Sequence, residues 1–328
     1  MKFTNIVAST VAALALSTSA VFAAEVTLRV GTVYQTSHTI SKGSAEFERL
    51  VEEKSNGAID VEVFYAEELG SEREMAEMTR AGGLEMVLSG LPGTGSFVPQ
   101  IEVMEAFYTY DDVEELARVV GAIAPELNAF MEPQGFHLVG YMYQGPRNLL
   151  STRPVRQFSD MQGLKLRIPQ TPLFVALAQN WGATPTAISL GEVYTSLESG
   201  VIDAVEGTSE TIVSSKFYEN AKYLTLTKHN FYPQPMVANK GWWDGLSDEH
   251  KQIIVESAQE AAAFQLSLHK AADEAALQAM RDGGVEIIEV DTGPFSEPVL
   301  AAMDEYIKSK GDDVYAVYQK MLEVAKQQ

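Results

Sequence analysis

Short segments with strand spacing alternate with amphipathic helical segments along most of the chain, and this alternation restricts the fold more than any other feature. Residues 26–30 and 59–65 have the apolar spacing of strands, and residues 41–54 between them have the spacing of a helix. Strand and helix patterns alternate again after residue 160. Such an order predicts an α/β fold, with parallel sheets flanked by helices.

Residues that start and stop helices support this alternation. Ser71 with Glu74, and Ser189 with Glu192, have the spacing of capping boxes, in which each side chain bonds the other residue's backbone. Pro172 suits the first position of a helix, where its missing N–H is not needed. We therefore expect helices to begin at these three places.

The length of 328 residues suggests two domains, yet no Pro/Gly-rich linker divides the chain. We expect two lobes, 25–144 with 233–272 and 145–232 with 273–328, joined by strands that cross between them and act as a hinge. Strands are expected at 137–143 and 148–151, with a turn between them. A helical pattern from 248 to 281 would span about 50 Å, so it is expected to cross both lobes.

Composition excludes several classes of function. The chain has 24 Lys and Arg against 45 Asp and Glu, a formal net charge of −21, which argues against binding nucleic acid or anionic lipid. It has no cysteine, which excludes disulfides, thiolate zinc sites and iron–sulfur ligation.

The N-terminus has the features of a secretory signal peptide. Lys2 precedes an apolar run at 6–16, and Val21 and Ala23 fit the small-residue cleavage site. The run is too short for a membrane span. Residues 1–23 are therefore expected to be removed on export, which places the mature protein outside the cytoplasm.

Motifs for catalysis, metals and cofactors are missing. The sequence contains no HExxH, GxSxG or GxGxxG motif. We therefore expect no metal and no cofactor. None of the five histidines has metal-ligand spacing relative to another: His38, His137, His229, His250 and His269.

Two arginines are candidates for binding an anion. Arg167 ends a strand just before Thr171, the expected cap of a helix, so its guanidinium lies beside free backbone N–H groups. Ligands of α/β folds sit at such strand ends. Arg147 follows Gly145 and Pro146 in the expected turn. For both arginines, an ordinary surface position remains the alternative interpretation.

Seven short segments in a fixed order form a recognisable set: LG at 69–70, GPR at 145–147, GLKLRIP at 163–169, GATP at 182–185, EVY at 192–194, VID at 201–203 and YLTLT at 223–227. With these segments the sequence resembles the DctP-type solute-binding proteins of tripartite ATP-independent periplasmic (TRAP) transporters. The resemblance covers essentially all of the chain after residue 23. It implies a two-lobed periplasmic binding protein, an arginine at 167 that pairs with a substrate carboxylate, and an assisting arginine at 147.

Departures from the family pattern add further candidate residues. Gly207 replaces an asparagine that contacts the ligand acid in many members, and Thr208 could supply a hydroxyl instead. Gln170 stands where sialic-acid-type members have asparagine. In the first lobe and the crossing strands, the pocket-lining candidates are Tyr34, His38, Ser89 and Tyr232. Glu206, next to Gly207, is a further ligand-binding candidate.

These observations predict an extracytoplasmic, monomeric receptor that binds a small organic anion and delivers it to a TRAP permease in the membrane. A carboxylate with hydroxyl or keto groups is favoured, a sulfonate is the competitor, and a C4-dicarboxylate comes third. Two alternatives remain at this point: a lyase or isomerase that uses Glu206 or His38, and a ligand-presenting partner of a sensor kinase.

Overall fold

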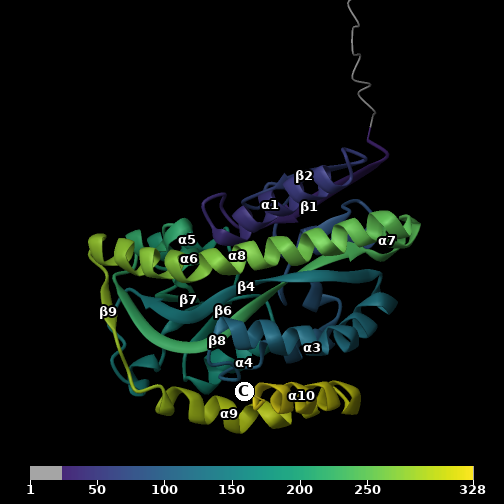
Figure 1. Cartoon of the computed structure of the whole chain (residues 1–328). Coiled ribbons are helices and arrows are strands. Elements are labelled where there is room, and N and C mark those ends of the chain that lie inside the picture. Colours follow the sequence, from purple (N-terminus) through teal and green to yellow (C-terminus); the bar gives the residue numbers. More distant parts are fainter. Residues whose placement is uncertain (1–23, 328) are drawn as a thin grey trace, which may run out of the picture.

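The computed structural model describes residues 24–327, so the expected signal peptide at 1–23 lies outside the described residues. Within this range the chain forms a nine-stranded mixed sheet with helices on both sides (Figure 1). The strands are β1 (Val26–Thr32), β2 (Ile59–Phe64), β3 (Met86–Leu88), β4 (Phe136–Ser151), β5 (Lys165–Ile168), β6 (Thr184–Ala187), β7 (Ala204–Thr208), β8 (Tyr223–Asn239) and β9 (Glu286–Ile288). The α-helices are α1 (Thr39–Lys54), α2 (Glu72–Ala81), α3 (Val113–Met131), α4 (Pro172–Asn180), α5 (Val193–Glu198), α6 (Ser209–Ser214), α7 (Lys240–Gly245), α8 (Asp248–Asp282), α9 (Gly293–Lys308) and α10 (Asp312–Ala325).

The sheet contains two parallel groups of strands, which confirms the α/β class. Strands β1, β2 and β3 form one group, and β5, β6 and β7 form the other. The expectation of two separate sheets needs correction, because the long antiparallel strands β4 and β8 lie between the groups and join them into one. They can do so because they have 16 and 17 residues, enough to pair with different neighbours at their two ends.

Strand β4 corrects a second expectation. The two strands and the turn predicted between 137 and 151 are one continuous strand, with irregular register against β8 between Gln144 and Pro146. Gly145 and Pro146 therefore mark a bulge, which bends a strand without ending it. Glycine is required at 145 because a Cβ there would lie 2.4 Å from Nε2 of His269 on α8.

Helix α8 confirms the prediction of one long helix. It has 35 residues and begins after Ser247, whose hydroxyl accepts the backbone N–H of His250. It packs on α1, β4 and α6, and Figure 1 shows it running along most of the molecule above β4 and β8. Across residues 24–327, neither this helix nor any other is long and apolar enough to span a membrane.

The expected helix starts are mostly confirmed. Ser71 and Glu74 form the capping box of α2. The Thr171 hydroxyl caps α4, which begins at Pro172. At the third place the Ser189 backbone N–H and hydroxyl donate to the Glu192 carboxylate and close a turn, so α5 begins only after it.

The C-terminal helices contact both halves of the molecule. Helix α9 packs near α4, whereas α10 packs on α3 (Figure 1). The division into lobes at 144/145, 232/233 and 272/273 stays a prediction.

Candidate functional site

A narrow cavity lies where the carboxyl ends of the two parallel groups meet. The cavity volume is about 50 Å³. Tyr34 follows β1, Glu72 follows β2, Arg167 belongs to the end of β5, Ser189 follows β6 and Gly207 belongs to the end of β7. Ligands of α/β proteins bind at this end of parallel strands, and here both groups contribute their ends to one cavity.

Arg167 lies on the cavity wall and is only 4% exposed. Its Nε and Nη2 groups donate to the backbone carbonyl of Ile188, at 3.1 and 2.8 Å. Within residues 24–327 no carboxylate forms an ion pair with it. Burial lowers the pKa of Arg167 to about 10, which still leaves the guanidinium charged at neutral pH. The wall therefore carries a buried positive charge that the chain itself does not neutralise by contact.

Arg147 lines the same cavity but is already paired. Its Nε and Nη2 groups donate to the two carboxylate oxygens of Glu206 at 2.5 and 2.7 Å, a bidentate ion pair. The guanidinium also lies 4.9 Å from the ring centre of Tyr232 and 5.3 Å from that of Phe174. The sequence suggested a turn arginine, whereas this side chain is 7% exposed because β4 continues through residue 147 and pairs with β7.

Glu206 is buried and ionised. Burial alone would raise its pKa, but the charge of Arg147 and hydrogen bonds from His229 and Arg147 outweigh burial and hold the pKa at about 2. An ionised carboxylate only accepts hydrogen bonds, so His229 must donate through Nε2, which lies 3.1 Å away. Its Nδ1 then accepts from the Thr227 hydroxyl at 2.9 Å. Every member of this cluster is satisfied by another.

Four further candidates from the sequence line the cavity: Gln170, Gly207, Tyr34 and Tyr232. The Tyr232 side chain has room in the cavity wall because residue 90 beside it is glycine. A Cβ on Gly90 would lie 2.1 Å from the Tyr232 hydroxyl oxygen. Gly207 leaves open space on the wall, since the atom nearest to a Cβ there would be 4.0 Å away, on Ile212.

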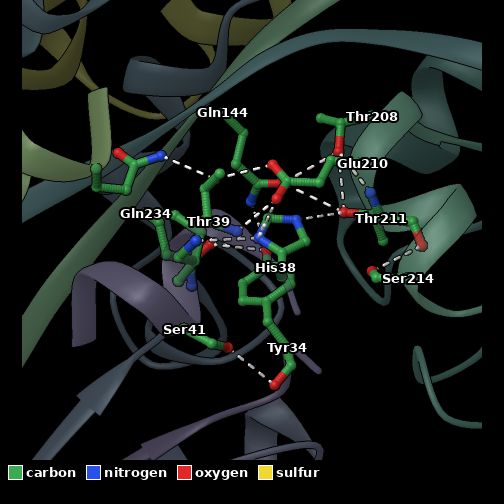
Figure 2. A network of polar contacts seen from close by, with 12 residues as sticks. Tyr34, His38, Thr39, Ser41, Gln144, Thr208, Glu210, Thr211, Ser214 and Gln234 are labelled. Carbon is green, nitrogen blue, oxygen red and sulfur yellow. Dashed lines mark hydrogen bonds and ion pairs between the residues drawn. The ribbon is translucent and has the colours of Figure 1, made fainter. Parts of the chain in front are cut away.

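Three other candidates, His38, Thr208 and Ser89, are buried but do not line the cavity. Figure 2 shows His38 and Thr208 turned toward Thr211, whose hydroxyl lies 3.2 and 2.9 Å from their polar atoms. His38 also caps α1 by accepting the Ile40 N–H, and burial lowers its pKa to about 3. The Ser89 hydroxyl accepts the Thr94 N–H. All three serve hydrogen bonding within the protein, and the contact of His38 with Thr211 joins residues 173 positions apart, which no local sequence pattern reveals.

The sequence reasoning missed two acidic residues on the wall, Glu67 and Glu72. Glu72 accepts the Gly90 N–H, and burial raises its pKa to about 7. Burial also raises the pKa of Glu67, which accepts the Gly191 N–H. A signal was present, since both follow β2, where a parallel strand delivers its connection to the ligand side of the sheet.

The sequence matches the DctP family profile, described as "Bacterial extracellular solute-binding protein, family 7", over residues 30–316. The chain belongs to this family. The 2,3-diketo-L-gulonate-binding periplasmic protein YiaO of Escherichia coli (strain K12) is 33% identical over 288 residues, which is 86% of this chain and 87% of that protein.

Two solved TRAP periplasmic solute-binding proteins have the same fold. One, from Actinobacillus succinogenes 130Z with bound L-galactonate, has a TM-score of 0.85 and 28% identity. The other, from Chromohalobacter salexigens DSM 3043 with bound D-glucuronate, has a TM-score of 0.86 and 27% identity. Each comparison covers 90% of this chain and 99% of the other. The expected two-lobed binding-protein fold is confirmed, and the family and these neighbours are binding proteins of the extracytoplasmic space.

Proposed function

We propose that the protein is a TRAP receptor that holds one small organic acid in this cavity, with the acid group on Arg167, and delivers it to the membrane permease. The observation that carries the proposal is the charge state of the wall. Arg147 and Glu206 neutralise each other at contact distance, whereas Arg167, within the part of the chain that the structure describes, bonds only one backbone carbonyl. A carboxylate supplies the negative charge and the paired acceptors that a guanidinium binds best.

The negative net charge of the whole chain does not oppose this proposal. Salt screens exposed charges beyond about 8–10 Å, whereas a buried guanidinium acts on its ligand at contact distance. The local charge of the cavity therefore decides what binds.

The other groups on the wall support an acid that carries hydroxyl or keto groups. Glu67, Glu72, Ser71, Ser189 and Gln170 line the cavity with Arg167 and provide donors and acceptors for hydroxyls. A second carboxylate placed beside Glu67 would cost energy in a buried site, unless it reached the exposed Arg73, which also lines the cavity. The acids named for the three relatives, diketogulonate, galactonate and glucuronate, each have one carboxylate and several oxygen-bearing carbons. We therefore rank sulfonates second and C4-dicarboxylates third.

We further propose that the ligand leaves unchanged. Glu206 has a pKa of about 2 and both its oxygens are bound, so it is a poor general base near neutral pH. His38 does not reach the cavity. NMR of the ligand over hours with the protein should show the same signals as the ligand alone, and new product signals would revive the enzyme alternative.

A thermal-shift screen tests the ligand class. A ligand at about 100 Kd adds about 2.7 kcal/mol of stability, so binding gives a readable rise in Tm. The panel contains hexuronates, aldonates, keto acids, short sulfonates, C4-dicarboxylates and neutral sugars. We expect the largest rise with a uronate or aldonate. Hits confined to neutral sugars would contradict the role of Arg167.

A further inference from the structure

Two connections from opposite sides of the cavity touch at its rim. The backbone N–H of Gly191, between β6 and α5, donates to Oε1 of Glu67, between β2 and α2, at 3.3 Å. Gly191 and Ala66 are exposed, while Glu67 is partly buried and lines the cavity. This contact therefore spans the rim of the site, between residues 124 positions apart in the chain.

Position 191 has no room for a side chain in this arrangement. A Cβ on Gly191 would lie 2.2 Å from Oε2 of Glu67 and 3.2 Å from its Cδ. The backbone of Gly191 is outside the left-handed region, so any residue could adopt its conformation. The glycine is needed there because of the contact with Glu67 rather than because of its own φ.

The chain holds Glu67 in place at some cost. Ala66 and Glu67 have φ of 54° and 62°, which residues with a Cβ seldom adopt. Their backbone N–H groups donate to the carbonyls of Tyr34 and Thr32 at the end of β1, at 3.0 and 3.3 Å. A strained turn that its surroundings hold in place is a reason to look for function.

We propose that Glu67 and Gly191 form a rim latch, a contact made only when the cavity is closed, and that glycine at 191 sets ligand affinity without touching the ligand. In a hinge rotation, the points farthest from the hinge move most, so a rim contact breaks on opening. Whatever stabilises the closed form alone raises the apparent affinity of a ligand that binds that form. This proposal rests on the proposed function only in the choice of the ligand whose affinity is measured.

A second set of contacts lies near the expected hinge and not at the rim of the cavity. Glu210 on α6 accepts both the backbone N–H and the hydroxyl of Thr39 at the start of α1 (Figure 2). Gln265 of α8 donates to that hydroxyl and also to the Tyr143 carbonyl of β4, beside the expected hinge. These contacts lie near the hinge, where closure moves atoms least, so we expect them to persist in both forms.

Gly191→Ala tests the latch. The added methyl group displaces the Glu67 carboxylate and removes one long hydrogen bond at an exposed position, so we expect affinity for D-glucuronate to fall about fivefold. The Tm of the ligand-free protein should stay level or rise, because alanine restricts the unfolded chain more than glycine does. Gly245→Ala is the matched control, since Gly245 is exposed and no atom lies within 4 Å of its added Cβ.

A double-mutant cycle tests whether the effect of the methyl group on affinity acts through Glu67. In a Glu67→Ala background the added methyl group has nothing to displace, so Gly191→Ala should then change affinity less than twofold. An equal loss in both backgrounds would overturn the proposal.

A distance measurement decides the question without a ligand. The sequence has no cysteine, so Glu68→Cys and Thr195→Cys, both at exposed positions near the rim, accept one spin label each. In each protein, the short distance reports the closed form and the long distance the open form. The ratio of short to long distances should be about fivefold lower in Gly191→Ala than in the protein with glycine at 191. Identical distributions would overturn the latch. If D-glucuronate changes the distance distribution of neither protein, the proposed ligand class is wrong. The comparison without ligand still tests the latch.

Discussion

The surroundings of Arg147 and Arg167 differ, although both side chains line one cavity and both are buried. Burial would lower the pKa of Arg147, but Glu206 reverses this and raises it, whereas burial dominates at Arg167 and lowers its pKa to about 10. The first arginine is held by a carboxylate of the chain, and the second has only a carbonyl among residues 24–327. Similar burial therefore leaves one cation paired with a carboxylate and the other, within residues 24–327, on a backbone carbonyl.

This difference predicts opposite roles for the two sites. A ligand acid at Arg147 would have to compete with Glu206, which bonds it through both oxygens. A ligand acid at Arg167 displaces no carboxylate. We therefore expect changes around Arg147 to alter stability, and changes at Arg167 to alter binding.

The largest effect should follow from breaking the pair at Arg147. Glu206→Gln keeps the side-chain shape but leaves a buried guanidinium without its counter-charge, which should cost about 3–5 kcal/mol of the free energy of unfolding. Urea denaturation measures this loss. Glu68→Gln, at an exposed position, is the control and should cost less than about 0.5 kcal/mol. A loss below about 1 kcal/mol for Glu206→Gln would mean that the pair is not structural.

Lowering the pH should weaken the same ion pair, because it protonates Glu206. The pKa of Glu206 is about 2 in the folded protein and about 4.3 when unfolded, so its charge stabilises the fold above pH 5 and this stabilisation is lost as the pH falls toward 2. The loss should be about 3 kcal/mol. Unfolding free energies measured from pH 6 to pH 2 should therefore fall less steeply in Glu206→Gln than in the unchanged protein. Parallel curves would contradict the low pKa.

Arg167→Ala should change binding instead. Removing one partner of a buried charge pair costs about 2–5 kcal/mol, so affinity for the best acid of the screen should fall about 100-fold. The Tm without ligand should be unchanged or higher, since an unpaired buried charge is removed. Calorimetric titration measures the affinity, with the exposed Arg153→Ala as control. Binding within a few-fold of the unchanged protein would refute the role of Arg167.

Arg167→Lys should have the smaller effect of the two. An ammonium group keeps the charge but not the planar pair of donors, so about a tenfold loss of affinity is expected. If lysine restored full affinity, charge alone would hold the ligand, and the paired geometry would be unnecessary.

Local patterns predicted much of the fold. The caps at Ser71 and Thr171 and the long helix after Ser247 each depend on residues near one another in the sequence, and the structure confirms them. The break predicted at Gly145 and Pro146 was wrong, because pairing with β7 and β8 carries β4 through a bulge. Such pairing is long-range, and no local pattern records it.

The site was harder to predict for the same reason. Arg147 meets Glu206 only because β4 and β7 run antiparallel in one register, with Leu149 opposite Glu206 and Arg147 opposite Thr208. Without that register, the two arginines looked equally free. The position of Arg167 was predictable, since a strand end before a capped helix is a local pattern.

A crystal structure with the acid that gives the largest thermal shift would show which arginine binds the acid group. We predict that the ligand carboxylate lies within about 3.2 Å of the Arg167 guanidinium nitrogens, a hydrogen-bond distance. The bidentate pair between Arg147 and Glu206 should remain as it is. An acid group bound to Arg147 in place of Glu206, with Arg167 still on the Ile188 carbonyl alone, would contradict the account.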